Sequence, residues 1–231
     1  MTKYLLVIIM LINSIIYAAP IISQDNNLLS NGSFESGNYN SVTGHSIGSA
    51  ASNWNQWSNS GGTLTTELIT ESEMVSNYGV ALHDGSSALK VTTSGSGDGP
   101  YTMNSWHTNW SQVSSSAVPF TFSGWVYVVS GSMYLAVGSN QTGYSNDTTV
   151  KTEEWEFVSS TRSSGTVNEL LLYATQASVF IVDSIWLNQG STSSHPNQIG
   201  ALGSTIPETQ TYLALILSLL FIYTAKILKI F

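Results

Sequence analysis

The sequence contains no cysteine and very few charged residues. Among its 231 residues there is no Cys, and Asp, Glu, Lys and Arg together make up 9%. Without cysteine the protein has no disulfide framework, no thiolate-bound zinc or iron–sulfur cluster and no thiol nucleophile. What the chain does have is 42% hydrophobic residues, enough at this length to bury one core of ordinary size.

Basic residues are scarce between the two ends of the chain. Six residues are Lys or Arg, and Lys3, Lys226 and Lys229 lie in the apolar terminal segments. Between those segments thirteen acidic residues accompany three basic ones, a net charge of about −10. Such a surface cannot replace the counterions of phosphate groups. We therefore expect no nucleic-acid partner, and no binding of this central part to an anionic membrane surface.

The first segment, residues 1–19, has the pattern of a secretory signal peptide. A lysine at Lys3 precedes an apolar run, and the small residues Ala18 and Ala19 supply a cleavage position. This pattern predicts export of the protein. The alternative is an uncleaved membrane anchor, but the unbroken apolar run from Tyr4 to Ile12 covers less than half of a hydrocarbon core about 30 Å thick.

The last segment, residues 206–231, has the pattern of a sorting or membrane segment. Pro207, Glu208 and Thr209 precede the apolar run 212–225, which Lys226 follows. As a helix this run would extend about 21 Å, so it predicts a marginal, at least transient membrane anchor. The segment resembles the PEP-CTERM sorting signals of exopolysaccharide-producing Gram-negative bacteria, which implies a sorting protease as a partner. A GPI signal is the alternative, although such a signal ends in an uncharged tail.

The central part, residues 26–190, is predicted to be all-β. It is rich in Ser, Thr, Gly and Asn, and we find no stretch with convincing helical periodicity. Short β-prone segments separated by turns predict a two-sheet antiparallel sandwich of the jelly-roll kind. Residues 191–205, with few large apolar side chains, are predicted to be a flexible linker. The expected strands are 63–70, 88–93, 101–110, 119–129, 132–138, 155–160, 168–174 and 178–187.

Several segments, in order, resemble the galactose-binding-like carbohydrate-binding modules. Together they span nearly all of the central part, and the resemblance implies their β-sandwich. That fold carries sugar binding, other ligand binding and purely structural roles. This chain departs from the family pattern in a long insertion before Trp54, and at Ser184, where the family often has a second aspartate. The segments are Asn27–Gly37 followed by Trp54, Asp84–Val91, Phe120–Val126, Trp155–Phe157 and Phe180–Leu187.

The resemblance also implies a structural calcium ion. Its carboxylate ligands would be Glu35, near the chain start, and Asp183, in the last strand, with backbone carbonyls completing the shell. Strict alternation would place Asp183 on a face with Ile185 and Leu187, where an unpaired charge is costly. Without calcium, Asp183 would accept hydrogen bonds from loop amides or pair with Lys90, and Glu35 would face water.

Aromatic residues flanked by amides are the candidates for sugar binding. An aromatic ring stacks on the apolar face of a pyranose, while neighbouring amides bind its hydroxyl groups. The alternative is that Trp54 packs beneath a sheet and that Trp106 and Trp110 cover an open face. The other three tryptophans of the strands, Trp125, Trp155 and Trp186, are expected in the core. The carbohydrate-binding candidates are Trp54, Trp57, Trp106, Trp110 and Tyr144.

Catalytic patterns are weak. Residues 44–48 match the Gly-x-Ser-x-Gly elbow, but that elbow needs a parallel sheet. Glu154 and Glu156 alternate with Trp155, as expected for the solvent-facing side of a half-buried strand. This pattern does not favour the paired catalytic carboxylates of a glycosidase. We therefore predict a non-catalytic exported protein, on the cell surface or in the extracellular matrix, that associates with extracellular polysaccharide. The alternatives are a structural matrix protein without sugar specificity and, less favoured, a glycoside hydrolase.

Overall fold

The computed structural model describes residues 27–196 except 39, 45–46, 60–61, 114–118 and 141. The predicted signal peptide, 1–19, and the predicted sorting segment with Pro207, Glu208 and Thr209 lie outside these residues. By its internal contacts the chain divides into the units Met1–Pro196 and Asn197–Phe231. No helix within the described residues combines the length and apolarity needed to cross a membrane.

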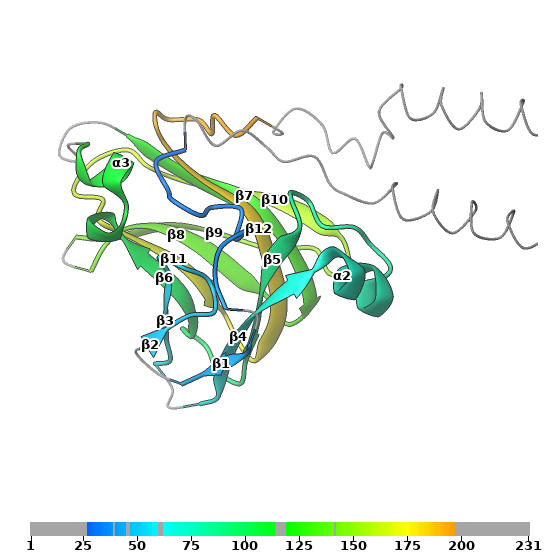
Figure 1. Ribbon diagram of the computed structural model, residues 1–231. Coiled ribbons are helices and arrows are strands. Elements are labelled where there is room, and N and C mark those ends of the chain that lie inside the picture. Colours follow the sequence, from blue (N-terminus) through cyan, green and yellow to red (C-terminus); the bar gives the residue numbers. More distant parts are fainter. Residues whose placement is uncertain are drawn as a thin grey trace, which may run out of the picture. The chain divides into compact units, whose positions relative to one another are not determined.

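The described residues form two six-stranded sheets (Figure 1). Every strand pair in both sheets is antiparallel, as predicted, so no parallel sheet supports the Gly-x-Ser-x-Gly pattern at 44–48. Sheet 1 has the order β1 (Val42–Thr43), β4 (Leu64–Thr70), β5 (Ser87–Thr93), β12 (Ser178–Gln189), β7 (Phe120–Ser130) and β10 (Trp155–Arg162). Sheet 2 has the order β2 (Ile47–Gly48), β3 (Asn55–Trp57), β6 (Gly99–Met103), β11 (Glu169–Ala174), β8 (Met133–Ser139) and β9 (Gly143–Thr148).

The main hydrophobic core contains side chains from both sheets. Alternate residues of the long strands, such as Phe120 and Phe122 of β7 and Leu170 and Leu172 of β11, are fully buried in it. This is the period of two that a strand with one buried face requires. The eight predicted strands correspond to β4, β5, β6, β7, β8, β10, β11 and β12, whereas β1, β2, β3 and β9 were not predicted. The predicted strand 101–110 is also too long: β6 ends at Met103 and short helices follow, η1 (Asn104–Trp106) and α3 (Thr108–Ser111).

The last strand, β12, contains a bulge that sequence alternation did not predict. The register shifts between Asp183 and Trp186, and Ser184 has a φ of 51°. The extra residue reverses the alternation beyond it. Ile185 and Leu187 therefore lie in the main core, not on the face of Asp183 as strict alternation predicted. Trp186, opposite Ser123, lies instead on the outer face of sheet 1.

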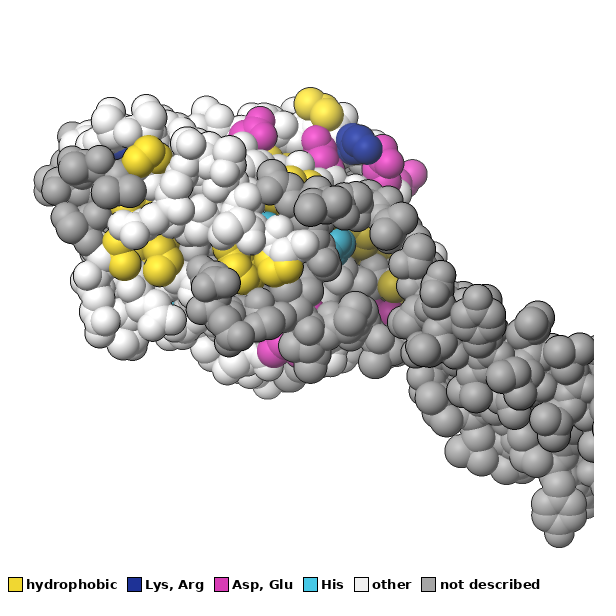
Figure 2. Space-filling view, turned by 90° about the horizontal axis from the view of Figure 1, so that it is seen from above, with side chains coloured by type: hydrophobic (Ala, Val, Ile, Leu, Met, Phe, Trp, Pro, Cys, Tyr) yellow, Lys and Arg dark blue, Asp and Glu magenta, His cyan; other side chains and the backbone are white. Residues whose placement is uncertain are grey.

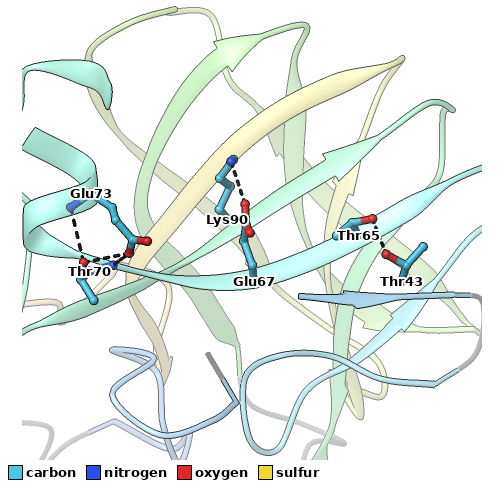
Figure 3. A network of polar contacts seen from close by, with 6 residues as sticks. All are labelled: Thr43, Thr65, Glu67, Thr70, Glu73 and Lys90. Carbon is cyan, nitrogen blue, oxygen red and sulfur yellow. Dashed lines mark hydrogen bonds and ion pairs between the residues drawn. The ribbon is translucent and has the colours of Figure 1, made fainter. Parts of the chain in front are cut away.

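The longest helix of the described residues, α2 (Glu71–Tyr78), was also not predicted. It follows β4 directly and begins with a capping box at Thr70 (Figure 3). The Glu73 amide donates to the Thr70 hydroxyl at 3.4 Å, and the Glu73 carboxylate accepts from the Thr70 amide at 2.8 Å. Gly79, with a φ of 74°, ends the helix. The Thr-x-x-Glu spacing followed by glycine was the available signal, because the helix is too short for a clear period.

The outer face of sheet 1 is partly covered by α2 and by residues 191–196. Next to β4 and β5, as Figure 1 shows, α2 and the residues after it bury a second cluster over the sheet. Residues 191–196 cover another part: the Ser193 hydroxyl lies 2.6 Å from that of Ser123, and His195 Nε2 lies 2.9 Å from the Ser184 hydroxyl. The packed domain therefore extends to Pro196, beyond the predicted boundary at 190. The rest of the predicted linker, 197–205, lies outside the described residues.

Candidate functional site

The chain start is held against the bulge of β12. The Asn27 side chain donates to the Ile185 carbonyl at 2.8 Å and accepts from the Leu187 amide at 3.0 Å. Gly32 approaches so closely that a Cβ there would lie 2.2 Å from the Ile185 carbonyl oxygen. These contacts give the Asn-Leu-Leu-Ser-Asn-Gly segment a structural role, which is to close the sandwich between its first and last segments.

Glu35 and Asp183 hold the same loop from two sides. The Glu35 carboxylate accepts from the amides of Ser86 and Ser87, at 2.9 and 3.1 Å, and from the Ser86 hydroxyl at 2.6 Å. The buried Asp183 carboxylate accepts from the amides of His83, at 2.9 Å, and Asp84, at 2.8 Å, and from its neighbour Ser184. Burial raises the pKa of Asp183 well above its usual value, and these hydrogen bonds oppose that shift.

The two predicted calcium ligands therefore face hydrogen-bond donors. Each carboxylate accepts three hydrogen bonds, and amide hydrogens repel a cation, so Glu35 and Asp183 as arranged here do not fit a calcium ion. Among the described residues, no group of three or more His, Asp or Glu side chains could hold a metal. Of the alternatives for Asp183, loop amides are what the structure shows, while Lys90 pairs with Glu67. Calcium binding itself stays a prediction.

The outer face of sheet 2 carries aromatic side chains. In β11, Leu170 and Leu172 point into the core, so the alternate residues Glu169, Leu171 and Tyr173 point outward. Residues directly opposite on neighbouring strands share a face. The strand registers therefore place on this face Tyr134 and Ala136 of β8, Tyr144 of β9, Tyr101 of β6, and Asn55 and Trp57 of β3.

The aromatic side chains of this face contact one another. The rings of Tyr134 and Tyr173 lie 6.2 Å apart, edge to face. The ring of Trp106, in η1 directly after β6, lies 5.7 Å from that of Tyr101. We call Trp57, Tyr101, Trp106, Tyr134, Tyr144 and Tyr173 together the aromatic face.

A polar group lies within the aromatic face. The Tyr144 hydroxyl donates to the Glu169 carboxylate across Gly138, which stands between them in the register. Gly138 has no room for a side chain, because a Cβ would lie 2.3 Å from the Gly143 carbonyl oxygen. Burial, followed by the hydrogen bond and the charge of Glu169, raises the pKa of Tyr144. Burial likewise raises the pKa of Tyr173, so both phenols stay protonated, and the Tyr144 hydrogen is donated to Glu169.

The structure separates the five aromatic residues predicted to bind sugar. Trp57 and Tyr144 are 38% and 37% exposed, and Trp106 is half-buried, so all three belong to the aromatic face. Trp54 is 2% exposed, with its ring 5.5 Å from that of Phe34, and Trp110 is fully buried. For these two the prediction is corrected: their rings pack in the main core and present no surface to a ligand.

Three tyrosines of the aromatic face were missed. Tyr101, Tyr134 and Tyr173 occupy strand positions that alternate with core residues, and each is half-buried. The available signal was the period of two in β11, where Glu169 and Tyr173 share a face. The sequence of a single strand does not show which of its two faces packs in the core, since both faces carry large apolar residues.

The acidic residues near β10 have structural partners. Glu156 accepts from the amides of Val150 and Lys151, both at 3.0 Å, and Glu154 pairs with the Lys151 ammonium at 3.4 Å. Trp155 points away from these acids, to the outer face of sheet 1, where its ring lies 5.7 Å from that of Tyr127. Glu156 stands opposite Val126 of the main core, so it does not lie on the solvent-facing side that alternation predicted. These contacts stabilise the loop before β10 and give the acids a role that requires no chemistry.

Three described histidines are also structural. His83 stacks on Trp125 at 4.1 Å, and His195 lies 5.5 Å from the ring of Trp186. Desolvation lowers the pKa of His83 to about 3 and those of His107 and His195 to about 4. All three are therefore neutral near pH 7. The fourth histidine, His45, lies outside the described residues.

The face of the molecule in Figure 2 carries few charged side chains. Hydrophobic side chains form small, separate patches on it among uncharged polar ones, with a few acidic groups.

No protein-family model and no curated protein matches this chain. Solved structures match it distantly. The CBM22-1 xylan-binding domain of Paenibacillus barcinonensis Xyn10C is 15% identical, with a TM-score of 0.42 over 68% of this chain and 99% of that domain. TmCBM61, solved with β-1,4-galactotriose, is 14% identical, with a TM-score of 0.44 over 71% and 99%. A family 22 carbohydrate-binding module of Clostridium thermocellum Xyn10B is 14% identical, with a TM-score of 0.41 over 71% and 99%. The β-sandwich of this chain thus resembles those of carbohydrate-binding modules.

Proposed function

We propose that this protein is a non-catalytic module that binds extracellular polysaccharide on the aromatic face of sheet 2. The single observation that supports this most is that the strand registers place five aromatic side chains on the outer face of sheet 2, with Trp106 against Tyr101, together with the Asn55 amide and the Glu169 carboxylate. Rings supply flat apolar surfaces for pyranoses, and the polar groups supply partners for their hydroxyls. Side chains held on paired strands lose little conformational entropy on binding.

The two sheets differ in a way that favours sheet 2. α2 and residues 191–196 cover part of the outer face of sheet 1, whereas Trp57 and Tyr144 of sheet 2 are each more than a third exposed. The proposal keeps the predicted export of the protein to the cell surface or matrix. That part rests on the sequence patterns at 1–19 and 206–231 alone.

Affinity electrophoresis in gels containing polysaccharides tests the proposal. The structural neighbours suggest xylan and β-1,4-galactan as the first probes, followed by a glycan array. We expect at least one polymer to retard the protein, and Trp57→Ala and Tyr144→Ala to weaken the retardation. The matched control is Tyr78→Ala, which removes a half-buried aromatic ring from α2 over sheet 1.

The proposal fails if no polymer retards the protein, or if Tyr78→Ala weakens binding as much as Trp57→Ala does. Loss of all retention would favour the structural matrix protein without sugar specificity. Release of reducing sugar by the purified protein would instead favour the glycoside hydrolase, whose paired carboxylates should lie about 5 to 10 Å apart.

A further inference from the structure

Glu169 is the carboxylate that the registers place on the aromatic face. It begins β11, is half-buried, and accepts the hydroxyl hydrogen of Tyr144. One such bond leaves most of the acceptor capacity of a carboxylate unused, because its two oxygens offer about four lone-pair positions. A negative charge in a partly desolvated aromatic setting is costly unless a donor or a cation approaches it.

None of the basic residues that the structure describes forms an ion pair with Glu169. Lys90 pairs with Glu67 at 2.7 Å on sheet 1, as Figure 3 shows. Lys151 pairs with Glu154. Arg162 donates to the carbonyls of Gly143 and Thr142, at 2.6 and 2.9 Å. Glu67 and Glu169 are thus both strand carboxylates, but only Glu67 forms an ion pair within the described part of the chain.

The surroundings of Glu169 suit a cation from outside. The charge of Glu169 contributes to the raised pKa values of Tyr144 and Tyr173, and Tyr134 contributes to both, so these groups lie within electrostatic reach of one another. Aromatic rings attract ammonium groups through their quadrupoles, and a carboxylate beside them adds a charge-assisted hydrogen bond. An anionic ligand would meet the charge of Glu169 without a compensating cation.

We propose that Glu169, beside Tyr144, binds the ammonium group of an amino sugar, and that Tyr134 and Tyr173, further along the same face, contact the same sugar chain. This inference rests on the proposed function and specifies its ligand: a polysaccharide that contains amino sugars without N-acetyl groups. Neighbouring rings such as Tyr101 and Trp106 would stack on adjacent sugar units. Polymers of uronic acids are rejected by the same carboxylate.

Isothermal titration of the full chain tests this assignment with three oligosaccharides of equal length. They are oligomers of glucosamine, of N-acetylglucosamine and of galacturonic acid, measured at low salt and at a pH where the amines are protonated. We expect the glucosamine oligomer to bind about tenfold more tightly than its acetylated counterpart, which has the same ring but no charge. The galacturonic acid oligomer should show no binding. Added salt should reduce the difference between the first two.

Two variants identify the residue responsible. Glu169→Gln keeps the size of the side chain and an acceptor for Tyr144, and should bring the affinities for the glucosamine and N-acetylglucosamine oligomers to within about twofold of each other. Its control is Glu154→Gln, which removes a carboxylate paired with Lys151 and should keep the preference.

The outcomes separate this inference from the proposed function. Equal affinity for the glucosamine and N-acetylglucosamine oligomers, or tighter binding of the acetylated one, overturns the amino-sugar assignment while polysaccharide binding stands. A preference that survives in Glu169→Gln also overturns it. Failure to bind any of these oligomers or any polymer in affinity gels overturns the proposed function as well.

Discussion

Trp54 and Trp57 provide a sharp test of the site, because they lie three residues apart and the structure gives them opposite roles. Trp54 is 2% exposed in the main core, whereas Trp57 is 38% exposed on the aromatic face. Replacing a fully buried tryptophan by alanine removes its burial energy and leaves a cavity, which costs about 3 to 5 kcal/mol. Truncating an exposed ring changes stability by about 1 kcal/mol or less.

The two substitutions should therefore have opposite signatures. Trp54→Ala should lower the free energy of unfolding in urea by about 3 to 5 kcal/mol. Trp57→Ala should leave that free energy nearly unchanged and raise the Kd for the retained polysaccharide about five- to thirtyfold, as loss of about 1 to 2 kcal/mol at a contact residue does. Equal destabilisation by the two substitutions would refute the burial argument. Unchanged affinity in Trp57→Ala would remove this residue from the site.

Three further predictions concern the loop, calcium and pH. Glu35→Ala should lower the free energy of unfolding in urea by about 1 to 2 kcal/mol, because it leaves loop amides without an acceptor; no change would contradict that role. Since hydrogen bonds already hold this loop, we expect EGTA to leave the melting temperature of the protein unchanged. If EGTA lowered the melting temperature and added calcium restored it, the calcium site predicted from the sequence would be supported. His83, His107 and His195 have lowered pKa values, so below pH 6.5 the unfolded chain takes up protons on them that the folded chain does not. Stability in urea should therefore fall from pH 6.5 toward about pH 4, by up to about 1.4 kcal/mol per pH unit for each histidine, while the raised pKa of Asp183 acts in the opposite direction and offsets part of this loss. A flat profile would refute the burial of the three histidines.

Much of the sandwich could be predicted because its long strands are β-prone segments separated by turns. β4 shows buried and half-buried residues in near alternation, whereas β7 is buried on both faces over nine consecutive residues. Helix α2 could not be predicted from periodicity, because eight residues make only about two turns. Its signal was the capping box at Thr70.

The bulge in β12 is a different kind of failure. Alternation is a local rule, but the shift at Ser184 comes from contacts with distant parts of the chain. The chain start inserts Gly32 against Ile185, whose amide donates to the Gly32 carbonyl at 2.7 Å, and Asp183 turns to the amides of the loop after α2. A single strand sequence contains neither partner, so the face of Trp186 could not be assigned from it.

The residues that define the family resemblance and the residues of the proposed site are largely separate sets. Asn27, Gly32, Glu35 and Asp183 close the sandwich around the β12 bulge, and their contacts are with backbone groups of this chain. Backbone contacts of this kind constrain the fold but leave the outer face of sheet 2 unconstrained. At the proposed site, ligand preference can therefore change through Glu169 and the tyrosines of the aromatic face without loss of the sandwich. For this reason the order of the family-like segments indicated the architecture and gave no information about the sugar.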